Sequence, residues 1–153
     1  MASSARKIQS VIQVVLAIVI IGLAYLLYTS IVEPYAKVER AKQVTEDTRA
    51  RMDNVRTAMI MYERENDRFV TSLDSLISWL KADSLIMANT DSVFGAPVML
   101  DSLPYSPRTG NSFTLQVNDT SDVKIYLLED PDSNDSIGSL ISDITLLNAS
   151  NWE

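Results

Sequence analysis

The chain has 153 residues, no cysteine, no histidine and a formal net charge of -7. The absence of cysteine excludes a disulfide framework and thiolate chemistry, and the absence of histidine removes the commonest general base and metal ligand at neutral pH. The acidic balance disfavours nucleic acid and anionic lipid headgroups as partners, because like charges repel. All twenty Asp and Glu residues lie after position 32. The part of the chain after position 32 is long enough for one small domain.

Residues 8–32 contain no charged side chain and form the longest apolar stretch of the sequence. As a helix these residues would span about 37 Å, which exceeds the roughly 30 Å hydrocarbon core of a bilayer. A secretory signal peptide has an apolar stretch of only about 7–15 residues, followed by small residues at its cleavage site. Here the stretch continues to Val32 and meets charged helical sequence. The pattern therefore predicts a retained transmembrane helix over residues 8–32, with membrane lipid as a partner.

Small and polar residues within this stretch predict where the membrane helix would contact other helices. In lipid, helices associate through close packing at small residues and through polar side chains. Ala17 and Ala24 are seven residues apart and share a face, Gln13 lies near the same seam, and Gly22 lies to one side. We expect these four residues to form the packing surface.

A second helical pattern covers residues 33–64, beginning beside Pro34. Apolar or small residues recur at steps of three or four, as on one face of a helix. They are Val38, Ala41, Val44, Thr48, Met52, Val55, Met59 and Tyr62. The whole stripe could pack on its own domain, but only the half from about Met52 is apolar enough to enter a core. We expect the earlier turns to contact other copies or partner subunits.

Residues 65–153 are expected to form a small acidic α+β head. Thr71 to Asp74 predict the start of a helix, with Thr71 as its N-cap and Asp74 near its positive end. The apolar stripe of that helix is Leu73, Leu76, Ile77 and Leu80, with Trp79 beside it, and the helix should end at about residues 81–84.

Two later segments alternate apolar and polar residues, as half-buried strands do. They are residues 113–117 and 123–127, and the polar residues 118–122 between them predict a hairpin loop. Residues 98–100, which follow Pro97, are expected to add an edge strand. The fold class is therefore α+β, with a long helix, a short helix and a small antiparallel sheet.

Two segments carry a more specific pattern. The first is VRTAMIMYERENDRFVTSLDSLISWL, with its distinctive positions at Arg56, Ala58, Met59, Tyr62, Asn66, Phe69, Thr71, Leu73 and Leu76. The second is LPYSPRTGNSFTLQV, with Pro107, Thr109, Gly110 and Phe113. Together with the apolar helix before them, these segments resemble the type IV pilins and the pseudopilins of type II secretion. The resemblance implies a pilin-like fold.

Several features of that family have no counterpart in this sequence. No glycine precedes Gly22 and no acidic residue precedes Glu33, so the leader cleavage site and the Glu of the apolar helix are missing. Asp67 stands where the family typically has glycine, and Val70 stands where it usually has proline. These departures favour a permanently anchored module over a processed filament subunit.

The orientation of the span is not settled by Lys and Arg counts. Only Arg6 and Lys7 precede it, whereas Lys37, Arg40, Lys42 and Arg49 follow it. The resemblance implies a short cytoplasmic tail, residues 1–7, and a C-terminal domain in the periplasm. We therefore expect a single-pass protein of the bacterial inner membrane.

Two small patterns invite ligand or catalytic interpretations. Asp130, Asp132, Asn134 and Asp135 place oxygen ligands at the alternate spacing of a calcium loop, but the loop lacks the sixth-position glycine and the closing Glu. A solvated acidic loop is the main expectation, and calcium is the weaker one, supported because major pseudopilins bind this ion in their C-terminal loops. Ser78 and Lys81 match the spacing of a serine–lysine pair, but no accompanying motif is present.

The sequence assembles no recognisable enzyme site, and we expect no catalysis and no cofactor other than the calcium considered above. The expected function is structural. It is that of a single-span subunit with a pilin-like domain, which contacts other membrane-complex subunits or copies of itself. The alternative is a pseudopilin that polymerises in a secretion or pilus-like filament.

Overall fold

The computed structural model describes residues 2–120, 123–141 and 143–153. The chain divides into two compact units, Met1–Gln43 and Val44–Glu153. Helix α1 comprises Ala2–Asn66 and contains Pro34. The predicted membrane helix and the predicted amphipathic helix are therefore segments of one helix, which ends within two residues of its expected end.

Asp67 ends α1 in the left-handed conformation, with φ of 56°. Its N–H donates to Glu63 O at 2.7 Å, which closes the last turn. Glycine adopts this conformation most easily, and Asp is among the few other residues that tolerate it. The backbone at this position thus has the geometry that glycine favours, although the residue is Asp.

Helix α2 comprises Leu73–Ala82, as predicted. Its N-cap residue is Ser72, and no side-chain hydrogen bond caps it, so the expected N-cap role of Thr71 is wrong. The extended backbone of Ser72 places the first turn one residue later than a Thr71 cap requires. The stripe of Leu73, Leu76, Ile77 and Leu80 is buried, as its spacing indicated.

Two short helices follow that the sequence pattern did not predict, α3 (Ser84–Ala88) and α4 (Thr90–Phe94). The Asp83 carboxylate caps α3 by accepting hydrogen bonds from Leu85 N and Ile86 N. The predicted edge strand at residues 98–100 is also wrong. The chain turns there instead, because Met99 O accepts hydrogen bonds from Ser102, and the turn η1 (Leu100–Ser102) buries Leu100.

The described strands form a three-stranded antiparallel sheet in the order β1-β2-β3. Strands β1 (Thr114–Asn118) and β2 (Ile125–Glu129) are the predicted hairpin, displaced by one or two residues. Ser121 and Asp122 of the predicted hairpin loop lie outside the described residues. Strand β3 (Ser136–Gly138) was not predicted. A further short turn, η2 (Ile144–Leu146), precedes the C-terminal segment.

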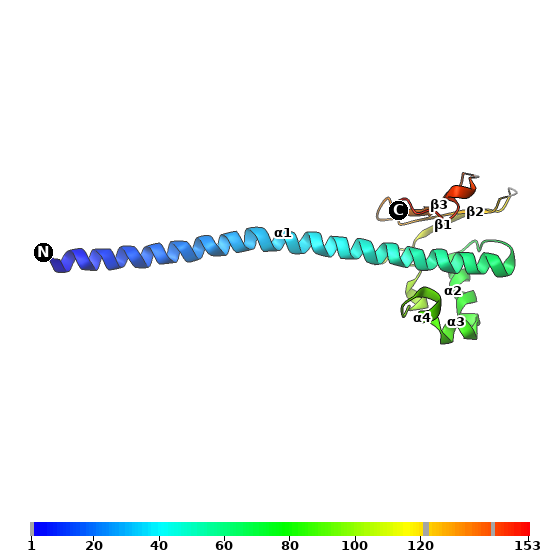
Figure 1. Cartoon of the computed structure of the whole chain (residues 1–153), viewed down its shortest axis with the longest axis horizontal. Helices are drawn as coiled ribbons and strands as arrows, with labels where there is room; N and C mark the ends of the chain where they lie inside the picture. The colour runs from blue at the N-terminus through cyan, green and yellow to red at the C-terminus, as the bar shows by residue number, and fades with distance from the viewer. Residues whose placement is uncertain (1, 121–122, 142) are drawn as a thin grey trace. The chain divides into compact units, whose positions relative to one another are not determined.

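The core lies around the part of α1 that belongs to the second unit. Figure 1 draws the strands on one side of this part of α1 and the short helices on the other. Met52, Val55 and Met59 of α1 are fully or almost fully buried, as predicted, but Thr48 is also fully buried, so the stripe becomes buried one turn earlier than expected. From the sheet, Tyr126 and Leu128 of β2 meet them in the same apolar cluster. The α+β class is therefore observed.

The C-terminal segment lies along the free edge of β3. Gly138 N donates to Ala149 O at 2.9 Å, and Asn151 N donates to Ser136 O at 3.0 Å. Ile137 and Ser150 form an isolated antiparallel bridge between them. One edge of the small sheet is thereby closed by the chain itself.

Candidate functional site

The apolar segment of α1 is the largest exposed hydrophobic surface among the described residues. From Ile8 to Val32 every side chain is exposed except Thr29, which is half-buried. The Thr29 hydroxyl donates to Tyr25 O and Leu26 O within the helix, so this donor has a hydrogen-bond partner without water. By length and composition, this segment is apolar enough to cross a membrane.

The predicted helix-packing residues all lie on this exposed segment. At 100° per residue, Gln13, Ala17 and Ala24 fall on one face of α1, whereas Gly22 falls near the opposite face. The four predicted residues therefore do not form a single packing face, because helical geometry separates Gly22 from the other three. Apart from its chain neighbours and the backbone of its own helix, no atom of the described residues lies within 4 Å of the position that a Cβ on Gly22 would occupy. Contact of this helix with other helices stays a prediction.

The residues of the predicted calcium loop lie at the turn between β2 and β3, against two arginines. Arg108 Nε donates to Asp130 Oδ2 at 3.0 Å, and its Nη2 donates to Asp135 Oδ2 at 3.2 Å. Arg49 of α1 donates to Asp135 Oδ1 at 2.9 Å. The Asp130 side chain is fully buried and that of Asp135 is 11% exposed. Sequence reasoning identified the carboxylates and missed both arginines.

The other two predicted ligands are held differently. Asp132 accepts hydrogen bonds from Asn111 Nδ2, at 3.0 Å, and from the Thr109 hydroxyl. The backbone carbonyl of Asn134 accepts from the Asn151 side chain. These contacts tie the acidic loop to the loop before β1 and to the C-terminal segment.

Electrostatics in this network favour the ionised form of Asp135 without a metal. The hydrogen bond from Arg49, together with the charges of Arg49 and Arg108, lowers the pKa of Asp135. The same hydrogen bond raises the pKa of Arg49. Among the described residues, no group of three or more Asp, Glu, His or Cys side chains is placed to hold a metal ion. A calcium ion would have to displace the guanidinium groups, and calcium binding stays a prediction.

A second polar cluster joins α1 to the C-terminal segment. Arg56 donates to Asn148 O at 3.0 Å, and the Tyr126 hydroxyl donates to Asn148 Oδ1 at 2.9 Å. An Arg56 nitrogen also lies 3.0 Å from Asp53 Oδ1. The approach is not aligned for a hydrogen bond, and that buried oxygen has no hydrogen-bond partner among the described residues. Burial accordingly raises the pKa of Asp53, although the Arg56 charge opposes the shift.

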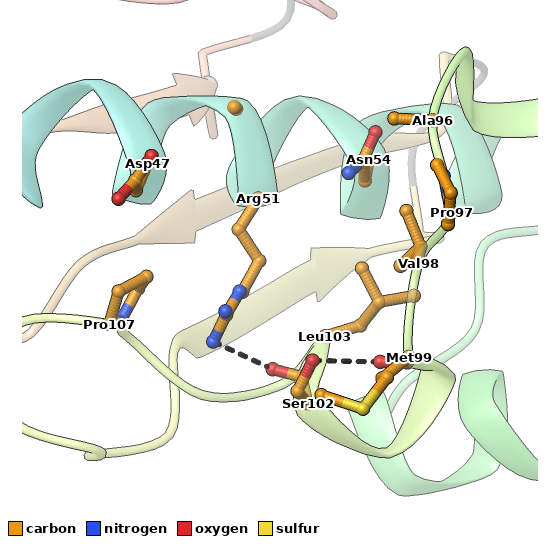
Figure 2. A pocket seen from close by; sticks show the side chains of 11 residues that line it. Asp47, Arg51, Asn54, Ala96, Pro97, Val98, Met99, Ser102, Leu103 and Pro107 are labelled. Atoms are coloured by element: carbon orange, nitrogen blue, oxygen red, sulfur yellow. Dashed lines mark hydrogen bonds between the residues drawn. The ribbon is translucent and has the colours of Figure 1, made fainter. Parts of the chain in front are cut away.

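A hollow of about 330 Å³ lies between α1 and residues 96–107 (Figure 2). Arg51 crosses it and donates to Ser102 O at 3.2 Å and to Tyr105 O at 2.8 Å. Its guanidinium is thus engaged by backbone carbonyls of the head itself. The exposed Met99 side chain forms part of the rim (Figure 2).

The serine–lysine pattern has no catalytic geometry in α2. The Ser78 hydroxyl donates to Asp74 O at 2.8 Å within the helix. Lys81 pairs with Asp101 and makes no described contact with Ser78. Nothing in this pair activates a nucleophile.

No protein-family model, no curated protein sequence and no solved structure matches this chain.

Proposed function

We propose that the chain is a single-span, membrane-anchored structural subunit without enzymatic activity. The observation that carries the proposal is the exposed apolar surface of α1 from Ile8 to Val32. Exposing that much apolar surface to water costs about 25 cal/mol for each Å², whereas a bilayer accommodates it. The second compact unit, residues 44–153, includes the end of α1 as well as the predicted head and is called the head from here on. It would act through contacts within a larger envelope assembly that contains other subunits or copies of this chain.

The resemblance to pilins and pseudopilins supports an extracytoplasmic, pilin-like head. A long helix that contains a proline leads into a small antiparallel sheet, which is the order of parts in that family. Asp67 occupies the left-handed position at the helix end where the family typically has glycine. We assign the chain to the permanently anchored class, because the apolar helix lacks the family's Glu, with no acidic residue before Glu33.

Membrane fractionation of the full chain tests the anchor. We expect the chain to stay in the membrane pellet after alkaline carbonate extraction. Replacing both Val19 and Leu23 with Arg should release it, because each arginine near the bilayer centre costs about 2.5–3.5 kcal/mol on insertion scales. The matched control adds two arginines at Ser84 and Asn89, which are exposed in the head, and should leave the protein in the pellet. Release of the unmodified chain would contradict the anchor.

The intact mass of the protein purified from native membranes separates the anchored subunit from the polymerising alternative. An unprocessed N-terminus supports a permanent subunit. A shortened chain that starts near Ile12 or Gln13 with a methylated amine would show pilin-type processing and support filament assembly.

A further inference from the structure

The outer edge of β1 carries backbone groups without a partner in the described chain. Phe113 N, just before β1, donates outward to Pro104 O at 2.8 Å. Because backbone groups alternate along an antiparallel strand, Leu115 and Val117 also direct their N–H and C=O groups outward. Gln116, between them, faces β2 opposite Leu127. Among the described residues, no backbone hydrogen bond engages the outward groups of Leu115 and Val117.

The two edges of the sheet differ in whether another segment of the described chain covers them. The β3 edge is closed by residues 149–151, as described above. Among the described residues, no backbone hydrogen bonds cover the β1 edge in this way, and its sequence TLQVN contains no charge, proline or glycine. Proteins protect open edges with charged side chains, prolines or bulges, because an unprotected edge is a template for another strand. The β1 edge has the features of a strand-pairing surface.

A hollow adjoins the start of this edge. A hollow of about 240 Å³ lies between residues 71–74, at the start of α2, and residues 112, 113 and 115. Leu115 and Val117 are half-buried and pack against the core cluster from the inner face of the sheet. An added strand would therefore extend both the hydrogen-bonded ladder and the apolar face.

We propose that β1 pairs with β1 of a second copy, antiparallel about a two-fold axis at Gln116. This register places Leu115 opposite Val117 of the second copy, so the outward N–H and C=O groups of both residues find partners. The head carries eight Lys and Arg against eighteen Asp and Glu residues, so two heads repel each other over most of their surface. An uncharged, self-complementary strand is the segment at which like-charged copies can meet. The inference rests on the proposed function, since it names one contact by which such a subunit assembles.

Single cysteines in the full chain in membranes test the register, because the natural sequence has no cysteine. Gln116→Cys places two thiols face to face in a non-hydrogen-bonded pair, where Cβ atoms approach to about 4.5–5.5 Å. Mild oxidation should give a disulfide-linked dimer. Thr114→Cys is the matched control on the same exposed face of the strand. Its two copies would lie about 13 Å apart, beyond the reach of a disulfide.

A charge variant gives a second measurement that does not depend on oxidation. Gln116→Lys keeps a side chain that can reach Glu129, whose carboxylate accepts a hydrogen bond from Gln116 at 3.2 Å. It also sets two ammonium groups opposite each other across the axis, so the dimer fraction of the full chain in detergent should fall. Thr114→Lys, which faces Asn118 of the second copy, should weaken the dimer less.

The outcomes separate this inference from the proposed function. Equal crosslinking at positions 114 and 116, no crosslink at either, or a Gln116→Cys crosslink to a different protein would overturn β1 self-pairing. If the chain still resists carbonate extraction in that case, only the pairing fails. If the Gln116→Cys crosslink forms but alkaline carbonate releases the chain from the membrane, the proposed membrane anchor is wrong and the β1 pairing is supported.

Discussion

Arg108 connects two carboxylates that the fold removes from water. Its side chain is 22% exposed, and its partner Asp130 is fully buried. A buried carboxylate is costly unless it is paired and hydrogen-bonded, and the Ser133 hydroxyl adds the only other side-chain donor described for Asp130, at 2.8 Å. Among the described residues, Arg108 is the one guanidinium that pairs with Asp130, whereas Asp135 also pairs with Arg49.

We expect Arg108→Met to destabilise the chain by about 3 kcal/mol or more, because it leaves the buried charge of Asp130 uncompensated. The measurement is thermal unfolding of the full chain in detergent, followed by tryptophan fluorescence. Lys124→Met is the matched control. Its partner Asp67 is 96% exposed, and exposed ion pairs contribute about 1 kcal/mol or less. Equal losses in the two variants would contradict the role assigned to Arg108.

Residue spacing identified the acidic loop but could not reveal what neutralises it. Arg49 and Asp135 are 86 residues apart in the sequence and meet only because α1 passes the β2–β3 turn. A local pattern of carboxylates is equally compatible with a metal-binding loop and with an ion-pair network. Which of the two forms depends on residues that are distant in the sequence, and no periodic pattern in the sequence identifies those residues.

Elements with long or regular patterns were predictable, and short ones were not. The stripe of α1 and the alternation of β1 and β2 each extend over enough residues to show a period. Strand β3 has three residues and helices α3 and α4 have five each, which is too short to establish one. The prediction of a strand at residues 98–100 was wrong because Leu100 lies in a turn that buries its side chain, and not in a strand whose side chains alternate between two faces.

At the scale of the membrane helix, packing should depend on Ala17 and Gln13. Ala17→Leu adds bulk where a neighbouring helix would approach closely, and Gln13→Leu removes an interhelical hydrogen bond that is worth about 0.6–2 kcal/mol in membranes. We expect either change to reduce recovery of the assembled complex after mild detergent extraction, while the melting temperature of the head is unchanged. Ile18→Leu, on a different face, is the control. Full recovery of the complex with both variants would exclude this face.

At the scale of the whole molecule, charge divides unevenly along the chain. Residues 1–43 carry five basic and two acidic side chains, whereas residues 44–153 carry eight basic and eighteen acidic ones. Anionic lipid headgroups attract basic segments near a membrane surface and repel acidic ones. The head is therefore unsuited to lie on an anionic surface, and protein contacts are its expected mode of attachment.

Cysteine labelling in cells tests the predicted orientation. We expect Asp119→Cys, at an exposed head position, to react with a membrane-impermeant thiol reagent once the outer membrane alone is permeabilised. Ser4→Cys, in the predicted cytoplasmic tail, should react only after the inner membrane is opened. Because the chain has no natural cysteine, each signal comes from one site. The reverse pattern would place the head in the cytoplasm, where a pilin-like envelope role is excluded while the membrane anchor still holds.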